Sequence, residues 1–317
     1  MTDTQNEVFK TPVNKIRLFE HGAPGSQNFK LTRKYYTEDM PDGRVKHIVQ
    51  NITDPDIVPY IPDGIGNSTD RQRIQAVLII PGGAFRRLVY NFEGEDVAKW
   101  LNSMGIAAFV LECRLPSDEH DNAEDVPLID AMRAMRVIRG RAQEFGIDEA
   151  KIGVMGFSAG GFMAALLSTA YESDVYADYK YKDEYDKLSA RPDFAVCSYP
   201  VISIDDCIEA GKRYMSEEQV LERISDSKAK ILHKYNPDKL VRPDMPPVFI
   251  CETDDDRTTL SENSVGFYMA ARKAGVSAEL HIFRTGGHGY GCGDDFAQTG
   301  EWKVLFTKWI KSIGIIS

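Results

Sequence analysis

The fold of this chain is decided by the stretch Lys151-Ile-Gly-Val-Met-Gly-Phe-Ser-Ala-Gly-Gly161. Its first part, residues 152–155, is a short apolar run of the kind that forms a buried strand. Glycines crowd around Ser158, and the apolar residues from Ala159 onward predict a helix. A Gly-x-Ser-x-Gly motif between a strand and a helix is typical of a serine whose Oγ stands exposed on a sharp turn. We therefore predict that Ser158 is a nucleophile at the edge of a sheet.

The rest of the chain alternates apolar runs with amphipathic segments. This order is typical of an α/β protein with a mostly parallel central sheet flanked by helices. The polar, helix-prone residues 202–239 predict a small helical cap insertion. Residues 1–37 are expected to form an irregular arm, and residues 45–53 and 57–61 an early pair of strands. Further strands are expected at residues 76–80, 106–111, 194–199, 248–251 and 278–283, and helices at residues 91–104, 128–145, 261–274 and 301–313.

The composition narrows the classes of protein to which the chain can belong. Its 317 residues are 43% hydrophobic and 27% charged, and this length fits one α/β domain with insertions over residues 1–317. The formal net charge of -10 argues against nucleic acid or an anionic membrane as a partner. No run is long enough to span a bilayer, and the N-terminus lacks the apolar core of a signal peptide. We therefore expect a cytoplasmic protein.

A glycine-rich loop follows the strand expected at residues 76–80. In Pro81-Gly-Gly-Ala-Phe85 the adjacent glycines let backbone N–H groups turn toward a bound carbonyl oxygen. The N–H of Ala159 can bind the same oxygen, because it lies at a helix N-terminus, which favours negative charge. We predict that Gly83, Ala84 and Ala159 form an oxyanion hole.

Two further loops complete the predicted site. The run Thr253-Asp-Asp-Asp256 follows a strand, and a carboxylate there could orient a histidine. His288 lies in the flexible loop Gly286-Gly-His-Gly-Tyr-Gly291 after the last strand. The order serine, acid, histidine is that of α/β-hydrolases. The alternatives for the acidic run are a solvated acidic turn and a calcium loop, but no EF-hand ligand pattern follows it. The five scattered cysteines form no C-x-x-C pair. We expect neither a metal nor a cofactor.

Motifs spread nearly end to end connect this chain with a known family. They are Gly22-Ala-Pro-Gly25, Pro81-Gly-Gly83, Glu93-Gly-Glu95, Gly105-Ile-Ala-Ala-Phe109, Gly153-Val-Met-Gly-Phe-Ser-Ala-Gly-Gly161, Leu188-Ser-Ala-Arg-Pro-Asp193, Glu262-Asn-Ser264 and Gly286-Gly-His-Gly289. In them the chain resembles the acetylxylan-esterase-like and acetyl-esterase-like branch of the α/β-hydrolases, related to the hormone-sensitive-lipase-type esterases. The resemblance implies an α/β-hydrolase fold with Ser158 as nucleophile, His288 as base and Asp256 as acid. Asp255 and then Asp254 are the alternatives for the acid.

By this resemblance the protein is expected to be a serine carboxylesterase acting on short-chain acyl esters, above all acetyl esters of carbohydrates. Its partner would be a small-molecule or oligosaccharide ester, and its oligomeric state is not predicted. The alternatives are an esterase for feruloyl or lipase-type esters, or a non-catalytic binding protein with the hydrolase fold.

The sequence leaves two alternative roles for each of two groups of side chains. Tyrosines at residues 171–185 and at Tyr214 would offer sugar rings an apolar face and a hydrogen-bonding edge, or would pack the insertions onto the sheet. Arg86 and Arg87, beside the oxyanion loop, would either meet a substrate carboxylate or form ion pairs within the protein.

Overall fold

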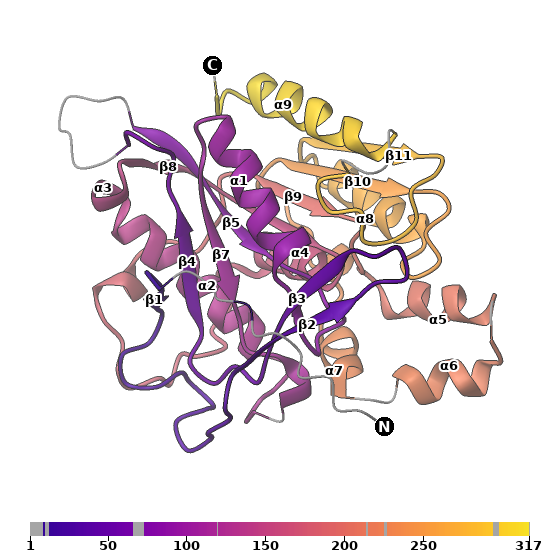
Figure 1. Cartoon of the computed structure of the whole chain (residues 1–317), viewed down its shortest axis with the longest axis horizontal. Coiled ribbons are helices and arrows are strands. Elements are labelled where there is room, and N and C mark those ends of the chain that lie inside the picture. The colour runs from indigo at the N-terminus through magenta and orange to yellow at the C-terminus, as the bar shows by residue number, and fades with distance from the viewer. Residues whose placement is uncertain are drawn as a thin grey trace.

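The computed structural model describes residues 9, 13–65, 73–118, 120–213, 215–224, 227–293 and 298–316 (Figure 1). In this part of the chain, one central sheet has eight strands. Side by side they are β1 (Ile16–Arg17), β4 (Asp56–Tyr60), β7 (Ala107–Glu112), β5 (Ile74–Ile80), β8 (Ile147–Phe157), β9 (Ala195–Ser198), β10 (Val248–Thr253) and β11 (Ala278–Phe283). Neighbouring strands from β7 to β11 are parallel, whereas the pairs β1–β4 and β4–β7 are antiparallel. The predicted mostly parallel sheet is confirmed.

Helices cover both faces of this sheet (Figure 1). On one face α1 (Asp96–Ser103) packs beside α9 (Trp302–Ser312), where the ring centroids of Trp100 and Trp302 lie 4.9 Å apart. The other face carries α2 (Val126–Gly140), α4 (Ala159–Ala170) and α8 (Ser261–Lys273).

The helix expected at residues 128–145 is divided in two. At Arg141 the φ and ψ angles of -102° and 15° leave the helical region, so α2 ends there and the short α3 (Ala142–Phe145) follows. Single turns complete the connections. They are the π-helical η1 (Asn91–Glu95) and the 3-10 turns η2 (Pro116–Asp118), η3 (Glu184–Lys187), η4 (Pro237–Lys239) and η5 (Thr299–Glu301).

The early strand pair expected from the sequence is wrong. In a separate sheet of three strands, β3 (Val45–Gln50) pairs with β2 (Lys34–Asp39) and β6 (Leu88–Val89). A short turn joins β2 to β3, so these two strands form a local hairpin. The next strand, β4, contains the fully buried Ile57 and Val58 and lies in the central sheet against β7. The arm expected over residues 1–37 therefore contains β1 and the start of β2.

In the described part of the chain between β9 and β10 there are three short α-helices. They are α5 (Ile204–Lys212), α6 (Glu217–Ile224) and α7 (Ser227–Lys234). The ammonium group of Lys234 lies 2.7 Å from the carboxylate of Asp125, in the loop between β7 and α2. This contact places the insertion at the end of the sheet where the parallel strands finish (Figure 1).

Apolar side chains from both faces of the sheet join one hydrophobic core. All of β7 and most of β5 are buried, as expected of strands covered on both faces. Within the described ranges, no helix has the length and apolar character needed to cross a membrane.

The backbone packs very closely where β8 ends and α4 begins. A Cβ atom on Gly156 would lie 1.9 Å from the carbonyl oxygen of Gly160, and one on Gly160 would lie 1.9 Å from that of Ile80. These distances are too short for any side chain, so only glycine fits at both positions. The contacts hold a sharp turn at Ser158, whose φ of 54° lies in the left-handed region that residues with a Cβ seldom adopt.

Gly156→Ala should therefore destabilise the protein by at least the roughly 1–3 kcal/mol that overpacking costs. Gly266 in α8 offers the matched control, because a Cβ there meets nothing within 4 Å. Gly266→Ala should stabilise the protein by about 0.5–1 kcal/mol, because alanine favours the helix. Chemical denaturation measures the free energy of unfolding of both variants. A Gly156→Ala protein as stable as the wild type would contradict the close approach of the two backbones.

Candidate active site

The predicted site residues come together at one edge of the central sheet. Ser158 directly follows β8, Asp256 follows β10 and His288 follows β11. Because these strands are parallel, their carboxyl ends lie at the same edge, where open α/β sheets bind their ligands. The loop after β5 brings Gly83 and Ala84 to this edge as well.

Ser158, His288 and Asp256 form a continuous chain of hydrogen bonds. The Oγ of Ser158 lies 2.8 Å from Nε2 of His288, and Nδ1 of His288 lies 2.7 Å from Oδ2 of Asp256. In the tautomer that suits this order, the serine hydroxyl donates to Nε2 and the Nδ1–H group donates to the carboxylate. The side chain of His288 is 21% exposed and that of Asp256 is fully buried. The arrangement can pass a proton from the serine to the imidazole.

Asp256 is fixed by three further hydrogen bonds. Its Oδ1 accepts the N–H groups of Thr258 at 2.7 Å and Thr259 at 2.9 Å, and its Oδ2 accepts the hydroxyl of Thr259 at 3.0 Å. Burial alone would raise the pKa of Asp256, but the hydrogen bond and charge of His288, together with the two N–H groups, lower this pKa overall. The carboxyl group therefore stays ionised at neutral pH and can stabilise an imidazolium.

The two neighbouring aspartates are exposed and make no contact with the imidazole in the described structure. The Oδ1 of Asp255 accepts the N–H of Gly287 at 2.8 Å, and the hydroxyl of Thr253 donates to the carbonyl of the same glycine at 2.9 Å. Gly287 precedes His288, so these two bonds fix the loop that carries the histidine. Of the three aspartates considered for the acid, Asp256 is the one that the structure places against His288.

The loop after β5 passes directly beside the serine. A Cβ atom on Gly82 would lie 2.9 Å from the Cβ of Ser158, so the lack of a side chain allows this approach. The N–H of Gly82 donates to Oε2 of Glu93 at 2.8 Å. This donor is therefore occupied, and an oxyanion has to find its partners elsewhere in the loop.

The next two residues have amide groups that suit this role. Gly83 and Ala84 adopt φ angles of 138° and 57°, and their N–H groups have no hydrogen-bond partner within the described part of the chain. Ala159, the third residue predicted for the hole, is the first residue of α4. Its N–H lies at a helix N-terminus, where negative charge is favoured. The structure thus brings the three predicted donors to the loops that flank the serine.

A family model, BD-FAE, matches residues 65–270 of the chain, which is more than half of its 317 residues. The chain belongs to the BD-FAE family. The matched range contains Ser158 and Asp256, and His288 lies beyond it.

Two curated relatives of this BD-FAE protein are longer than the chain itself. The acetylxylan esterase of Xylanibacter ruminicola is 31% identical over 241 residues, which cover 75% of this chain and 46% of the relative. The endo-1,4-beta-xylanase B of Butyrivibrio fibrisolvens is 29% identical over 269 residues, which cover 82% of this chain and 40% of the relative. The chain therefore spans less than half the length of these curated relatives.

Solved structures share the fold. An acetyl ester-xyloside bifunctional hydrolase from Caldicellulosiruptor lactoaceticus has a TM-score of 0.72 and 34% identity, covering 96% of this chain and 97% of its own. A carboxylesterase from Lactobacillus plantarum has a TM-score of 0.67 and covers 90% of this chain and 99% of its own; at 20% identity it shows the fold alone. The predicted α/β-hydrolase fold and the resemblance to acetyl-esterase-like hydrolases are confirmed.

The sequence does not single out two buried side chains that adjoin the site of this BD-FAE protein. Glu93 binds the N–H of Gly82, and the ring of Tyr199 lies edge-on to His288 with the ring centroids 5.0 Å apart. Glu93 does occur in a motif that carries the family resemblance. Tyr199 directly follows β9, at the edge where site residues gather. The motif and the position after a strand are the two sequence features that could have identified Glu93 and Tyr199.

The arginines beside the oxyanion loop connect it to the second sheet. Arg87 forms an ion pair with Glu38 on β2, and the carbonyl of Arg86 accepts a hydrogen bond from Gln50 on β3. For Arg87 the structure favours the ion-pair alternative over contact with a substrate carboxylate.

The tyrosine-rich segment after α4 does not adjoin the site. The 12 residues of α4 extend about 18 Å away from Ser158 before this segment begins. Tyr176 and Tyr179 are buried there, and the hydroxyl of Tyr179 donates to the carbonyl of Gly22. Of the two alternatives left open for these tyrosines, the structure favours packing for Tyr176 and Tyr179, because the rings of both contact Phe19 in the N-terminal part of the protein. Tyr214 lies outside the described residues.

Among the residues that the structure describes, no group of three or more histidine, cysteine or acidic side chains could hold a metal ion. The described cysteine side chains are free thiols in buried positions: Cys113, Cys197, Cys251 and Cys292. Burial raises the pKa of Cys197 and so keeps it a neutral thiol.

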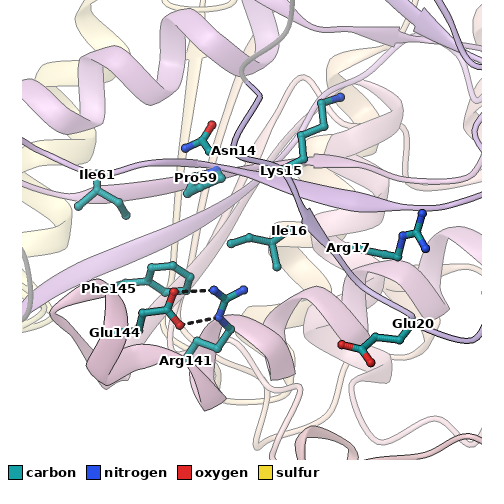
Figure 2. A pocket seen from close by; sticks show the side chains of 10 residues that line it. All are labelled: Asn14, Lys15, Ile16, Arg17, Glu20, Pro59, Ile61, Arg141, Glu144 and Phe145. Carbon is teal, nitrogen blue, oxygen red and sulfur yellow. Dashed lines mark hydrogen bonds and ion pairs between the residues drawn. The ribbon is translucent and has the colours of Figure 1, made fainter.

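A broad groove of about 870 Å³ lies at the opposite end of the sheet (Figure 2). It contains Phe145, which precedes β8, whereas Ser158 follows the same strand. Arg141 and Glu144 face each other in the groove and are joined by hydrogen bonds of 2.5 and 2.8 Å. Its described lining contains neither serine nor histidine. The groove therefore offers no nucleophile of the kind found at the other end.

Ser158→Ala should remove nearly all ester hydrolysis, with a loss of up to ~10⁶-fold in kcat, because no other group replaces the nucleophile. The fold should remain, since the substitution removes one hydroxyl. A fluorophosphonate should label Ser158 covalently, as shown by mass spectrometry of the modified peptide. Labelling of a different serine would contradict the assignment.

Asp256→Asn should lower kcat roughly 10⁴-fold, because the amide cannot hold the imidazole in the required tautomer. Asp254→Asn is the matched control and should leave kcat nearly unchanged, because Asp254 is exposed and the carboxylate hydrogen-bonded to His288 is that of Asp256. Steady-state kinetics on one ester compares the two. Near-normal kcat in Asp256→Asn would show that another group is the acid.

Proposed function

We propose that this protein is a serine carboxylesterase that cleaves short-chain acyl esters, above all acetyl esters of carbohydrates. The observation that carries the proposal is the hydrogen-bonded chain from Ser158 through His288 to Asp256. In it Ser158 is the nucleophile, His288 transfers the proton, and Asp256 orients the imidazole and stabilises its cation.

The first half of the reaction forms an acyl-enzyme. The Oγ of Ser158 attacks the carbonyl carbon of the ester while Nε2 of His288 takes the hydroxyl proton. The carbonyl oxygen becomes an oxyanion, which is stabilised by the N–H groups of Gly83, Ala84 and Ala159. His288 then gives its proton to the leaving alcohol as the C–O bond breaks.

The second half releases the acid. A water molecule attacks the acyl carbon while Nε2 of His288 takes one of its protons. The same N–H groups stabilise the second oxyanion. The proton then passes from His288 to the Oγ of Ser158, and the carboxylic acid leaves. The reaction as written uses water and the ester and needs no cofactor.

A small cavity beside the serine supports a short acyl group. It is lined by Gly82 and Ala159 next to the serine, by apolar side chains that include Phe85, Leu115 and Met163, and by two arginines, Arg87 and Arg114. The space in it is about 10 Å³, which is room for about one water molecule. A methyl group needs little more than this, whereas a long acyl chain would have to displace core side chains.

The names of two relatives support acetyl esters of carbohydrates. One is an acetylxylan esterase at 31% identity, and the other is an acetyl ester-xyloside bifunctional hydrolase at 34% identity over nearly all of both chains. Feruloyl and lipase-type esters remain the alternatives, and the proposed cavity argues against long acyl groups. The complete Ser–His–Asp chain favours an enzyme over a binding protein with this fold.

Two further expectations stay predictions. The helices α5 to α7 lie at the same end of the sheet as the serine, which supports their role as a small cap over the site within a single domain. A cytoplasmic location rests on the sequence alone.

A chain-length series at fixed alcohol tests the acyl preference. The kcat/KM for p-nitrophenyl acetate, butyrate and octanoate should fall steeply beyond butyrate, because each poorly fitting methylene costs about 1 kcal/mol or more. The same enzyme should release acetate from acetylated xylo-oligosaccharides. A maximum at octanoate would contradict a short acyl site.

Leu115→Ala tests whether the preference for short acyl groups comes from the cavity. Enlarging the cavity should raise the butyrate-to-acetate ratio of kcat/KM. Leu101→Ala removes a fully buried leucine in α1, outside the cavity lining, and should lower stability without changing this ratio. An unchanged ratio in Leu115→Ala would show that the acyl group binds elsewhere.

A further inference from the structure

Glu93 is a buried carboxylate that the proposed reaction does not use. It lies in η1, directly before α1, and is 5% exposed. Its Oε2 accepts the N–H of Gly82 in the oxyanion loop at 2.8 Å. Its Oε1 accepts the hydroxyl of Tyr199, after β9, at 2.9 Å. Both carboxylate oxygens are therefore bound to residues that adjoin the site.

Tyr199 extends this connection to the histidine loop. It is fully buried, and its hydroxyl accepts the N–H of Gly291 at 3.1 Å. Its ring lies edge-on to the imidazole of His288, with an angle of 70° between the planes. Its carbonyl oxygen lies 3.3 Å from the hydroxyl oxygen of Thr259, whose hydrogen goes to Asp256. Tyr199 thus contacts the histidine and acid loops, and it reaches the oxyanion loop through Glu93.

We propose that Glu93 is a positioning residue that holds the oxyanion loop in place relative to His288. The connection runs from Gly82 through Glu93 and Tyr199 to Gly291. The inference rests on the proposed esterase reaction, in which the oxyanion donors and the histidine act on the same bound ester. Glu93 itself does not touch the substrate and acts through the two loops.

Both oxygens of Glu93 must accept a hydrogen bond in this network. The N–H of Gly82 can only donate. The hydroxyl of Tyr199 already accepts the N–H of Gly291, so its own hydrogen goes to Glu93. An ionised carboxylate accepts both hydrogens, whereas a glutamine accepts only one. Burial raises the pKa of Glu93, and the charge of His288 and these two hydrogen bonds oppose that rise.

The carboxylate lies close to the nucleophile as well. A Cβ atom on Gly82 would lie 2.7 Å from Oε2 of Glu93 and 2.9 Å from the Cβ of Ser158. The carboxylate and the serine therefore both lie on the side of Gly82 where a side chain would project. A shift of Gly82 would carry Gly83 and Ala84 with it, and a misplacement of 1 Å costs on the order of 100-fold in rate.

The surroundings of Glu93 differ from those of the other glutamate in the same turn. Glu95 is partly exposed and pairs with Lys99 at 2.7 Å on the surface. Glu93 is distinguished from Glu95 because both of its hydrogen-bond donors, the N–H of Gly82 and the hydroxyl of Tyr199, come from segments that adjoin the site.

With little change in volume, Glu93→Gln breaks one bond of the connection, and Tyr199→Phe breaks the two that its hydroxyl makes. In Glu93→Gln the kcat for p-nitrophenyl acetate should fall ~10- to 100-fold, with KM changed less than about threefold, because the loops act mainly on the transition state. Glu93→Asp keeps two acceptor oxygens and should recover part of this loss. The double variant should lose little more than Glu93→Gln alone, because both substitutions break the same connection.

Glu112→Gln is the matched control. Glu112 is a fully buried carboxylate that pairs with Lys15 and Arg33 at 2.6 Å each. Its substitution should lower the melting temperature but leave kcat per folded molecule unchanged. Wild-type kcat in Glu93→Gln, or an equal loss of kcat in Glu112→Gln, overturns the inference and leaves the esterase proposal standing. A wild-type protein that neither hydrolyses esters nor reacts with a fluorophosphonate overturns both.

Discussion

Direct backbone contact between the end of β8 and the start of α4 places the whole site. Gly156 and Gly160 allow this contact, because a Cβ on either residue would lie 1.9 Å from a carbonyl oxygen. The contact holds Ser158 in a left-handed conformation with its Oγ at the edge of the sheet. It also sets the N-terminus of α4 beside the serine, where a developing negative charge is stabilised. One packing constraint thus positions the proposed nucleophile and one of the proposed oxyanion donors together.

Backbone strain in the described chain is concentrated around this constraint. Ala84, Phe85, Ser158 and Tyr199 have φ angles between 37° and 58°. The other described non-glycine residues with positive φ are two asparagines, which tolerate this region. Such conformations cost about 1–3 kcal/mol each and persist only where the surrounding structure holds them. The buried sheet and its two helical layers supply that support, so stability elsewhere compensates the strain that shapes the site.

Two buried carboxylates lie on different sides of the reacting groups. Asp256 is hydrogen-bonded to His288 and to the Thr258–Thr259 turn, so its charge faces the imidazole that becomes positive. Glu93 is bound to the oxyanion loop and to Tyr199, so it adjoins the side where negative charge develops. A carboxylate is tolerated there because each of its oxygens has a hydrogen-bond donor. The difference in surroundings supports the different roles that we propose for the two acids: Asp256 stabilises a charge, and Glu93 holds loops.

The sequence by itself determined the strand–turn–helix around Ser158, the α/β alternation and the order of the site loops, because glycine conformation and hydrophobic periodicity are local properties. The family resemblance ranked Asp256 first among three adjacent aspartates, but only the tertiary structure placed it against His288 and showed that β4 joins the central sheet. It also decided that Glu93 is buried while Glu95, in the same turn, is not. These outcomes depend on contacts between segments far apart in the chain. Such contacts form only when the whole core packs, and no local pattern encodes them.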